Sequence, residues 1–186
     1  MLTRRAGLAA CAAVLSGAAA PAVRLVVQGR LLSGAGTPVP CTVGWRGIRA
    51  DKREGDGATP AGTFPLRRVL FRPDRMLPPQ TGLPVQALSS ADAWCDDPAD
   101  PAYNQPIHLP HATHHEVLWR TDGLYDLVVP LGYNDAPAVP GRGSAIFLHV
   151  ARPDSGPTEG CVAIGRAALL SILQQCGPGT AISIHA

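Results

Sequence analysis

Short apolar runs separated by glycine- and proline-rich turns follow one another along most of the chain. Runs of four to eight apolar or β-branched residues bounded by such turns are typical of β-strands. An Asp122-Gly123 pair between two of the runs predicts a hairpin turn. We therefore expect strands at residues 24–28, 39–45, 63–64, 116–120, 124–130, 144–150 and 181–184.

Only one segment has a convincing helical period. Residues 166–175 place Leu169, Leu170 and Leu173 on one face, and Gly177 is positioned to end the helix in a left-handed cap. The pattern predicts a mainly β fold, a sandwich or barrel with one helix near its end. The length of 186 residues fits one domain.

The N-terminus follows a different pattern from the rest. A positive start containing an Arg-Arg pair is followed by small apolar residues at 6–20 and by an A-x-A sequence at 20–22. These are the parts of a signal peptide, with a partial twin-arginine motif, and the apolar stretch is too short to span a membrane. We expect residues 1–22 to be removed and residues 23–186 to act in the periplasm or cell envelope without a membrane span.

Composition narrows the possible partners. Hydrophobic residues make up 46% of the chain and charged residues 16%, which favours a packed core over disorder. The net charge is only +2, and no lysine or arginine stripe is present, so nucleic acid is not an expected partner. The glycine-rich stretch at residues 55–63 lacks the Lys-Ser/Thr ending of a phosphate loop, and we expect no cofactor.

Four cysteines remain after the predicted cleavage: Cys41, Cys95, Cys161 and Cys176. In an oxidising compartment cysteines either pair or are kept free for a reason. The sequence leaves the pairing of Cys41, Cys95 and Cys176 open. A catalytic cysteine cannot be one of the paired residues.

His149 and Cys161 are the candidate catalytic pair. His149 ends an apolar run, and Gly160 stands directly before the cysteine. Cysteine catalysis requires a thiolate, a base and donors for a developing oxyanion, and a nearby imidazolium would lower the pKa of the thiol. Glycine lets the backbone approach a substrate, and the N–H of Cys161 can serve as an oxyanion donor. The alternative is a buried cysteine and histidine without chemistry.

Two separated motifs favour the catalytic interpretation. The segment at residues 59–64 reads T-P-A-G-T-F, and His149 is followed by T-E-G-C at 158–161. Together they resemble the L,D-transpeptidase catalytic domain of the YkuD type. Residues 94–104 and 133–149 look like the branch of that family that ends in G-C-V-A. The resemblance spans most of residues 23–186 and implies a YkuD-like β-sandwich or barrel, with a helix after the catalytic cysteine.

The resemblance also implies a reaction. Cys161 would attack the L-centre carbonyl of diaminopimelate in a peptidoglycan stem peptide, His149 would move protons, and Gly160 would lie in the oxyanion region. Release of D-alanine leaves a thioester, which an acceptor amine resolves into a crosslink of the 3-3 or 1-3 type. Alternatives are a hydrolytic L,D-carboxypeptidase or amidase, action on a wall-protein linkage, and a non-enzymatic wall-binding module. Binding alone would need neither Cys161 nor His149.

Substrate contacts are expected from an acidic, aromatic loop at residues 91–106, from the loop that contains Tyr133 and Asn134, and from the residues before Cys161. An aspartate there can meet the ammonium of diaminopimelate in a charge-assisted bond. The solvated turn is the alternative for these loops. The expected substrate-binding residues are Trp94, Asp97, Tyr103, Asn104, Tyr133, Asn134, Thr158 and Glu159.

The chain departs from the common pattern of the family near the candidate site. It has Val150, Glu159 and Ala163 where many family members have a small residue, histidine and arginine. The loop between His149 and Cys161 is also short, and we expect substrate specificity to depend on these departures. A histidine group at 108–115 lacks the spacing of a defined metal site, and we expect no metal.

Overall fold

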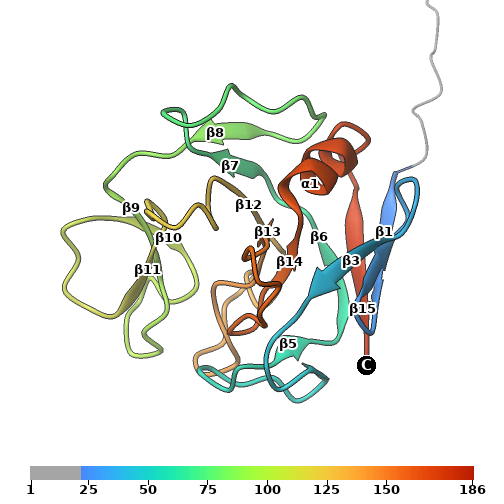
Figure 1. Ribbon diagram of the computed structural model, residues 1–186. Helices are drawn as coiled ribbons and strands as arrows, with labels where there is room; N and C mark the ends of the chain where they lie inside the picture. The colour runs from blue at the N-terminus through green and yellow to red at the C-terminus, as the bar shows by residue number, and fades with distance from the viewer. Residues whose placement is uncertain (1–21) are drawn as a thin grey trace, which may run out of the picture.

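A computed structural model describes residues 22–186 (Figure 1). The predicted signal segment at residues 1–21 lies outside the described residues. The described part consists of β1 (Arg24–Gln28), β2 (Leu31–Ser33), β3 (Val39–Thr42), β4 (Ile48–Arg49), β5 (Thr59–Pro60), β6 (Gly62–Pro65), β7 (Val69–Phe71), β8 (Val85–Ala87), β9 (Asp92–Cys95), β10 (Pro106–His108), β11 (His115–Val117), β12 (Leu127–Pro130), β13 (Phe147–Val150), β14 (Val162–Ile164), α1 (Arg166–Leu173) and β15 (Ala181–His185).

The main sheet has ten strands in the order β6-β15-β1-β2-β3-β14-β13-β12-β7-β8. It curls into a half-barrel, and α1 is the single helix of residues 22–186 (Figure 1). The predicted mainly β fold with one helix after Cys161 is therefore confirmed. β13 and β14 run parallel at the centre of this sheet, whereas β3 and β12 flank them in the antiparallel sense.

The two faces of the central strands serve two separate cores. Leu148 belongs to the larger core, which the helix covers with Leu169 and Leu173. Phe147 belongs to a second core, in which its ring packs edge-to-face on Trp94 at 5.2 Å between centroids. Successive strand residues point to opposite faces, so His149 shares the face of Phe147. The candidate base therefore lies on the side of the smaller core.

The small sheet β10-β9-β11 builds the outer wall of that second core. Residues 91–106 were expected to form a loop, but Asp92–Cys95 is the buried middle strand of this sheet. The expected hairpin around Asp122-Gly123 is also wrong. β11 pairs with β9, and β12 joins the main sheet between β7 and β13. Burial of apolar side chains against different sheets outweighs the local turn preference.

The helix begins at the predicted residue and ends two residues earlier than predicted. Leu169, Ile172 and Leu173 are its buried residues. The expected left-handed cap at Gly177 is wrong, because Gln174 ends the helix in a right-handed conformation and Gly179 takes the positive φ. Within the described part of the chain, no helix combines the length and apolar character that a membrane crossing needs.

The cysteines outside the candidate site are core residues. Cys41, Cys95, Cys161 and Cys176 are all buried and unpaired within residues 22–186. Burial raises the pKa of the Cys41 and Cys176 thiols to about 11. These two thiols therefore stay protonated at neutral pH and behave as small apolar side chains.

Candidate active site

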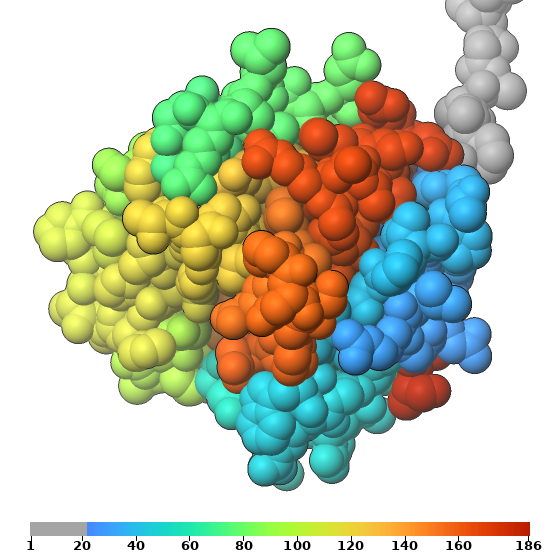
Figure 2. Space-filling model, in the orientation of Figure 1, coloured from blue at the N-terminus to red at the C-terminus, as the bar shows by residue number. Residues whose placement is uncertain are grey.

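Cys161 and His149 open into one cavity of about 360 Å³. The cavity is bordered by the turn before β14, the end of β13 and the segment at residues 52–55. Figure 2 shows the orange loop that follows β13 projecting on this face, between the yellow and the cyan segments. The pair that lies twelve positions apart in the sequence is thus brought to one site by two parallel neighbouring strands.

The register of β13 and β14 decides this juxtaposition. Leu148 pairs with Val162 and His149 with Ala163, which puts Cys161 level with Phe147. The Phe147 N–H donates to Cys161 Sγ at 3.4 Å. The Cys161 S–H in turn donates to the carbonyl oxygen of Ala145 at 3.2 Å. The sulfur is therefore held by backbone groups on the chain that leads into the histidine strand.

The resting pair is neutral. Burial lowers the pKa of His149 to about 4, and burial raises the pKa of Cys161 to about 12. An imidazolium that lowers the pKa of the Cys161 thiol is therefore not the resting state of the free protein, because desolvation penalises both charged forms. His149 Nδ1–H donates to the Val150 carbonyl at 2.9 Å, which leaves Nε2 as the unprotonated nitrogen. A neutral imidazole can accept a proton, so this state suits a general base.

The turn before the cysteine needs glycine at position 160. Gly160 has φ +141°, and a Cβ there would lie 2.9 Å from the Ala58 carbonyl oxygen. Thr158 Oγ1 donates to the Cys161 carbonyl at 2.6 Å and accepts from the Gly160 N–H at 3.2 Å. Thr59 Oγ1 donates to the same carbonyl at 3.3 Å. The first threonines of the two sequence motifs, T-P-A-G-T-F and T-E-G-C, therefore meet at the backbone of the cysteine.

Asn104 connects the aromatic loop to the site. Its Oδ1 accepts from Trp94 Nε1 at 2.9 Å and from the Ala145 N–H at 3.1 Å. Its Nδ2 donates to the carbonyls of Tyr133 and Asn134 at 3.0 and 2.7 Å. Asn104 is itself buried and has φ +57°. It positions Ala145, whose carbonyl accepts from the Cys161 thiol.

Tyr103 is a second buried tether. Its hydroxyl donates to Glu54, accepts from the Gly143 N–H, and shares Glu54 with the Ser144 hydroxyl. Burial is the main reason that the pKa of Tyr103 lies well above its ordinary value. This tether joins the segment at residues 52–56 to the strand that carries His149.

The remaining predicted contacts fall into two groups. Thr158 and Glu159 line the cavity, and Glu159 accepts from Trp45 Nε1 at 2.9 Å. Trp94, Asp97, Tyr103, Asn104, Tyr133 and Asn134 are not among the residues that line it. Asn134 orders its own loop by bonding Val139 and Gly143, and Asp97 accepts from the Ala99 N–H at 2.9 Å. A direct substrate contact by this second group stays a prediction.

Sequence reasoning missed several cavity residues. Tyr125 packs edge-to-face on the His149 ring at 5.2 Å between centroids. Arg120 lies over the Tyr125 ring and bonds Asp122 and Glu116. The cavity is further lined by Lys52, Glu54, Asp96 and Arg152. Charged residues in turn-rich segments look like solvated surface in a sequence, so no signal separated these from their neighbours.

Three histidines in or just after β10 each pair with an aspartate: His108 with Asp92, His111 with Asp100, and His114 with Asp96. Cys95 joins the middle pair, and the potential ligand atoms of Cys95, Asp100 and His111 lie within 4.8 Å of one another. Asp100 also accepts from Thr113 at 2.7 Å. The sequence did not predict this grouping, which lies apart from the residues that line the cavity.

Comparison with known proteins gives one match. The chain matches the YkuD family, the L,D-transpeptidase catalytic domain, over residues 23–184. No curated protein and no solved structure matches the chain. The matched residues include both halves of the main sheet and the whole cavity.

Proposed function

Because the chain belongs to the YkuD family of L,D-transpeptidase catalytic domains, we propose that Cys161 is its nucleophile and His149 its general base. The family implies a cysteine enzyme with a peptidoglycan substrate. One observation carries the residue assignment. The only cysteine of residues 22–186 that lines the cavity also shares that cavity with the buried, neutral imidazole of His149.

The proposed acylation begins from the neutral pair. As Cys161 Sγ attacks the L-centre carbonyl of diaminopimelate, its proton passes to His149 Nε2. The C–N bond to D-alanine then breaks, and the proton moves from His149 to the departing amine. The Nδ1–H bond to the Val150 carbonyl fixes the tautomer and stabilises the transient imidazolium. The product is a thioester on Cys161 and free D-alanine.

The second half-reaction regenerates the thiol. An amine of a second stem peptide attacks the thioester carbonyl and gives its proton to His149. The C–S bond breaks, and His149 returns the proton to Cys161 Sγ. The product is a new peptide bond between two stems, of the 3-3 or 1-3 type. This chemistry needs no cofactor. The G-C-V-A sequence supports our placing the chain in the branch that its motifs resemble.

The N–H of Cys161 itself is the proposed oxyanion donor. The Gly160 N–H already donates to Thr158 Oγ1, so it is not the open donor that an oxyanion requires. Thr158 and Thr59 both hold the Cys161 carbonyl, which fixes the orientation of the peptide group that follows the nucleophile. A fixed backbone around the reacting atoms lowers the reorganisation needed in the transition state.

The rim of the cavity suits a zwitterionic ligand. Arg152 and Glu159 are exposed residues that lie between His149 and Cys161 along the chain and line the cavity. An arginine can bind a carboxylate through a bidentate hydrogen bond, and a carboxylate can bind an ammonium. Diaminopimelate presents both groups at the end of its side chain. We assign Arg152 and Glu159 to these two groups, alongside the contacts expected from Thr158.

The place of action follows from the substrate. Stem peptides lie outside the cytoplasmic membrane, so the proposed enzyme must be exported to meet them. The signal-peptide pattern of residues 1–22 supports export, and residues 23–186 would then be the mature domain. Fractionation of cells that express the full chain, with detection of the cleaved form, tests this assignment.

Incubation of residues 23–186 with disaccharide-tetrapeptide, followed by mass spectrometry, tests the reaction. We expect dimers that have lost D-alanine, with the fragmentation pattern giving the bond. Cys161→Ala should abolish them, whereas Cys176→Ala, which alters a buried cysteine outside the cavity, should retain them. Trimmed monomers without dimers would establish hydrolysis instead. Equal activity of Cys161→Ala would refute the nucleophile assignment.

A further inference from the structure

Lys52 is a buried cation that the proposed mechanism leaves unused. Its side chain is only 3% exposed, and it lines the catalytic cavity. Lysine is almost never buried unless it is paired, because removal of its charge from water is costly. Lys52 Nζ donates to Asp56 Oδ1 at 2.5 Å and to the Arg53 carbonyl at 2.8 Å. The turn at residues 52–56 is thus built to hold this ammonium in place.

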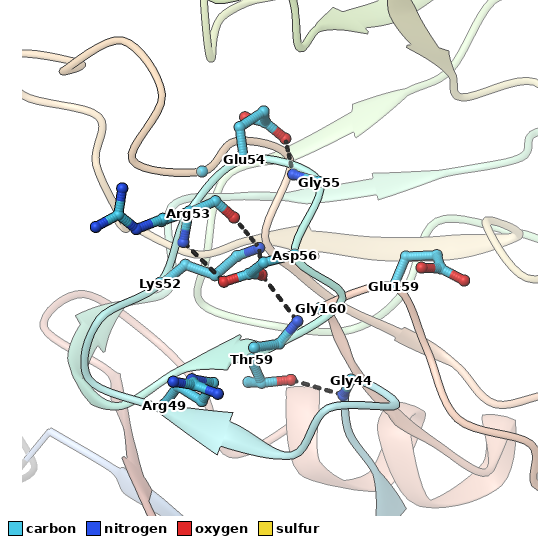
Figure 3. A network of polar contacts seen from close by, with 12 residues as sticks. Gly44, Arg49, Lys52, Arg53, Glu54, Gly55, Asp56, Thr59, Glu159 and Gly160 are labelled. Atoms are coloured by element: carbon cyan, nitrogen blue, oxygen red, sulfur yellow. Dashed lines mark hydrogen bonds and ion pairs between the residues drawn. The ribbon is translucent and has the colours of Figure 1, made fainter.

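The ion pair of Lys52 and Asp56 has its two ends in different places. Lys52 lines the catalytic cavity, whereas Asp56 lies in a separate surface hollow with Arg46, Arg49 and Arg53. Asp56 is further fixed by the N–H groups of Arg53 and Ala58. Figure 3 shows the pair beside Gly160, with the Arg53 side chain directed away from it. The positive end of the pair therefore faces the site, and the negative end faces the outer surface.

The ammonium lies close to the turn that carries the nucleophile. A Cβ on Gly160 would lie 3.6 Å from Lys52 Nζ. A lysine ammonium has three N–H donors, and two of them are used by Asp56 and Arg53. Burial raises the pKa of the Cys161 thiol, and the Lys52 charge acts in the opposite direction as a smaller effect. A cation at this place favours any negative charge that forms at Cys161.

We propose that Lys52 is a positioning residue whose buried ammonium, directed into the cavity by Asp56, stabilises negative charge on Cys161 and on the oxyanion formed there. The role rests on the proposed function of Cys161 as the nucleophile. Lys52 makes no bond to the substrate carbon and gives up no proton. It supplies a fixed positive potential from a buried position, where a charge is less screened than at the surface.

The charge can be measured with two alkylating reagents of similar size. Iodoacetate is an anion and iodoacetamide is neutral, and both react with the same thiolate. The rate with iodoacetate divided by the rate with iodoacetamide at Cys161 does not depend on the thiolate fraction or on the accessibility of the sulfur, so it reports the local electrostatic potential. Both rates are measured by peptide mass mapping. Their ratio is then normalised by the same ratio for free N-acetylcysteine. We expect a normalised ratio above one that persists in 1 M salt, because a buried charge is poorly screened.

Variants identify the source of the potential. Lys52→Met should lower the normalised ratio roughly threefold or more, as expected for loss of a nearby cation. Lys52→Arg, which retains the charge, should keep the ratio close to that of the wild-type protein. Arg53→Met removes one exposed positive charge from the same turn and should leave the ratio unchanged. A purely structural role for Lys52 would slow both reagents alike and would not move the ratio.

Two results would overturn the proposal: a wild-type ratio at or below that of N-acetylcysteine, or an unchanged ratio in folded Lys52→Met. The first result is measured on the wild-type protein, so the proposal can be refuted even if Lys52→Met does not fold. The assay also needs no peptidoglycan. Loss of crosslinking with a normal ratio would count against the proposed reaction, whereas normal crosslinking with no Lys52 effect would count against this inference alone.

Discussion

Two short segments flank the Gly160–Cys161 turn and differ in almost every physical respect. The inner clamp, residues 52–59, buries Lys52, Ala58 and Thr59 and bonds directly to the cysteine backbone or to its neighbours. The outer loop, residues 151–157, contains no buried residue and projects on the surface (Figure 2). The same nucleophile thus has one rigid and one open side.

The buried segment is suited to hold the nucleophile in place, whereas the exposed segment is suited to select the substrate. Buried polar groups must be satisfied, so a change in the inner clamp disturbs several bonds at once. Exposed side chains cost little to change, so the outer loop can vary its charges without loss of the fold. Four experiments follow from this contrast, and each pairs a change at the site with a matched control elsewhere in the chain.

Replacement of the glycine at the junction should give the largest effect. Gly160→Ala forces φ +141° on an alanine and places its Cβ 2.9 Å from the Ala58 carbonyl oxygen. We expect crosslinking to fall by more than about a hundredfold, because the nucleophile is displaced. Gly156→Ala, in the outer loop, meets the end of the Asp154 side chain at 3.2 Å and Arg152 Cδ at 3.6 Å, both flexible side chains, and should stay within about twofold of wild type. Similar losses for both variants would remove the contrast.

A fall in pH should destabilise the folded protein because the buried His149 resists protonation. The unfolded imidazole titrates near 6.5 and the folded one at about 4, so only the unfolded state gains this proton between those values. Stability is fully present above about pH 6.5 and falls as the pH drops toward 4, by about 3 kcal/mol at most for this group. Urea unfolding between pH 4 and 7 measures the slope. His149→Gln should flatten it.

An exposed histidine provides the matched control for that slope. The Asp96 carboxylate bonded to His114 raises the pKa of His114, which is the opposite shift. Its contribution is present at low pH and is lost as the pH rises through the raised value. His114→Gln should therefore leave the acid slope intact or steepen it. A flatter slope in this variant would contradict the assignment to His149.

Loss of the buried Thr59 hydroxyl should give the next largest effect, a loss of folding stability. Thr59 is fully buried, accepts from the Gly44 N–H at 2.8 Å and donates to the Cys161 carbonyl. Thr59→Val keeps the shape and leaves the Gly44 N–H unpaired, so we expect about 1–3 kcal/mol of lost stability. Chemical denaturation measures it. Thr63→Val, at an exposed position shortly after, should cost under about 0.5 kcal/mol, and an equal cost would refute the burial argument.

The open side should give the smallest effect on stability and a selective effect on substrate use. Arg152→Gln should raise the KM for the tetrapeptide donor by roughly threefold to tenfold with little change in kcat, because a carboxylate partner is lost. Its unfolding free energy should stay within about 0.5 kcal/mol of wild type. Arg68→Gln, which removes an arginine outside the cavity, should change neither. A loss of kcat in Arg152→Gln would place it in the chemistry instead.

The local pattern of apolar residues was enough to predict the elements whose buried face follows from their own sequence. β1 was predicted at its observed residues, and α1 was predicted from its first residue, since apolar periodicity selects the buried face. The outer sheet was missed, because Asp92–Cys95 has a loop-like sequence on both sides and becomes a strand only by pairing with β10 and β11. Its burial is a property of its neighbours, which no local window contains.

Motif order and strand period are local features of the chain, so they were enough to predict the family, the mainly β architecture and the two residues proposed for the chemistry. The charge states of these two residues and the groups that hold them depend on the folded packing. Desolvation depends on every atom packed around a group, so the neutral His149–Cys161 pair could not be foreseen. For the same reason Lys52 resembled a surface lysine until the fold buried it beside Gly160.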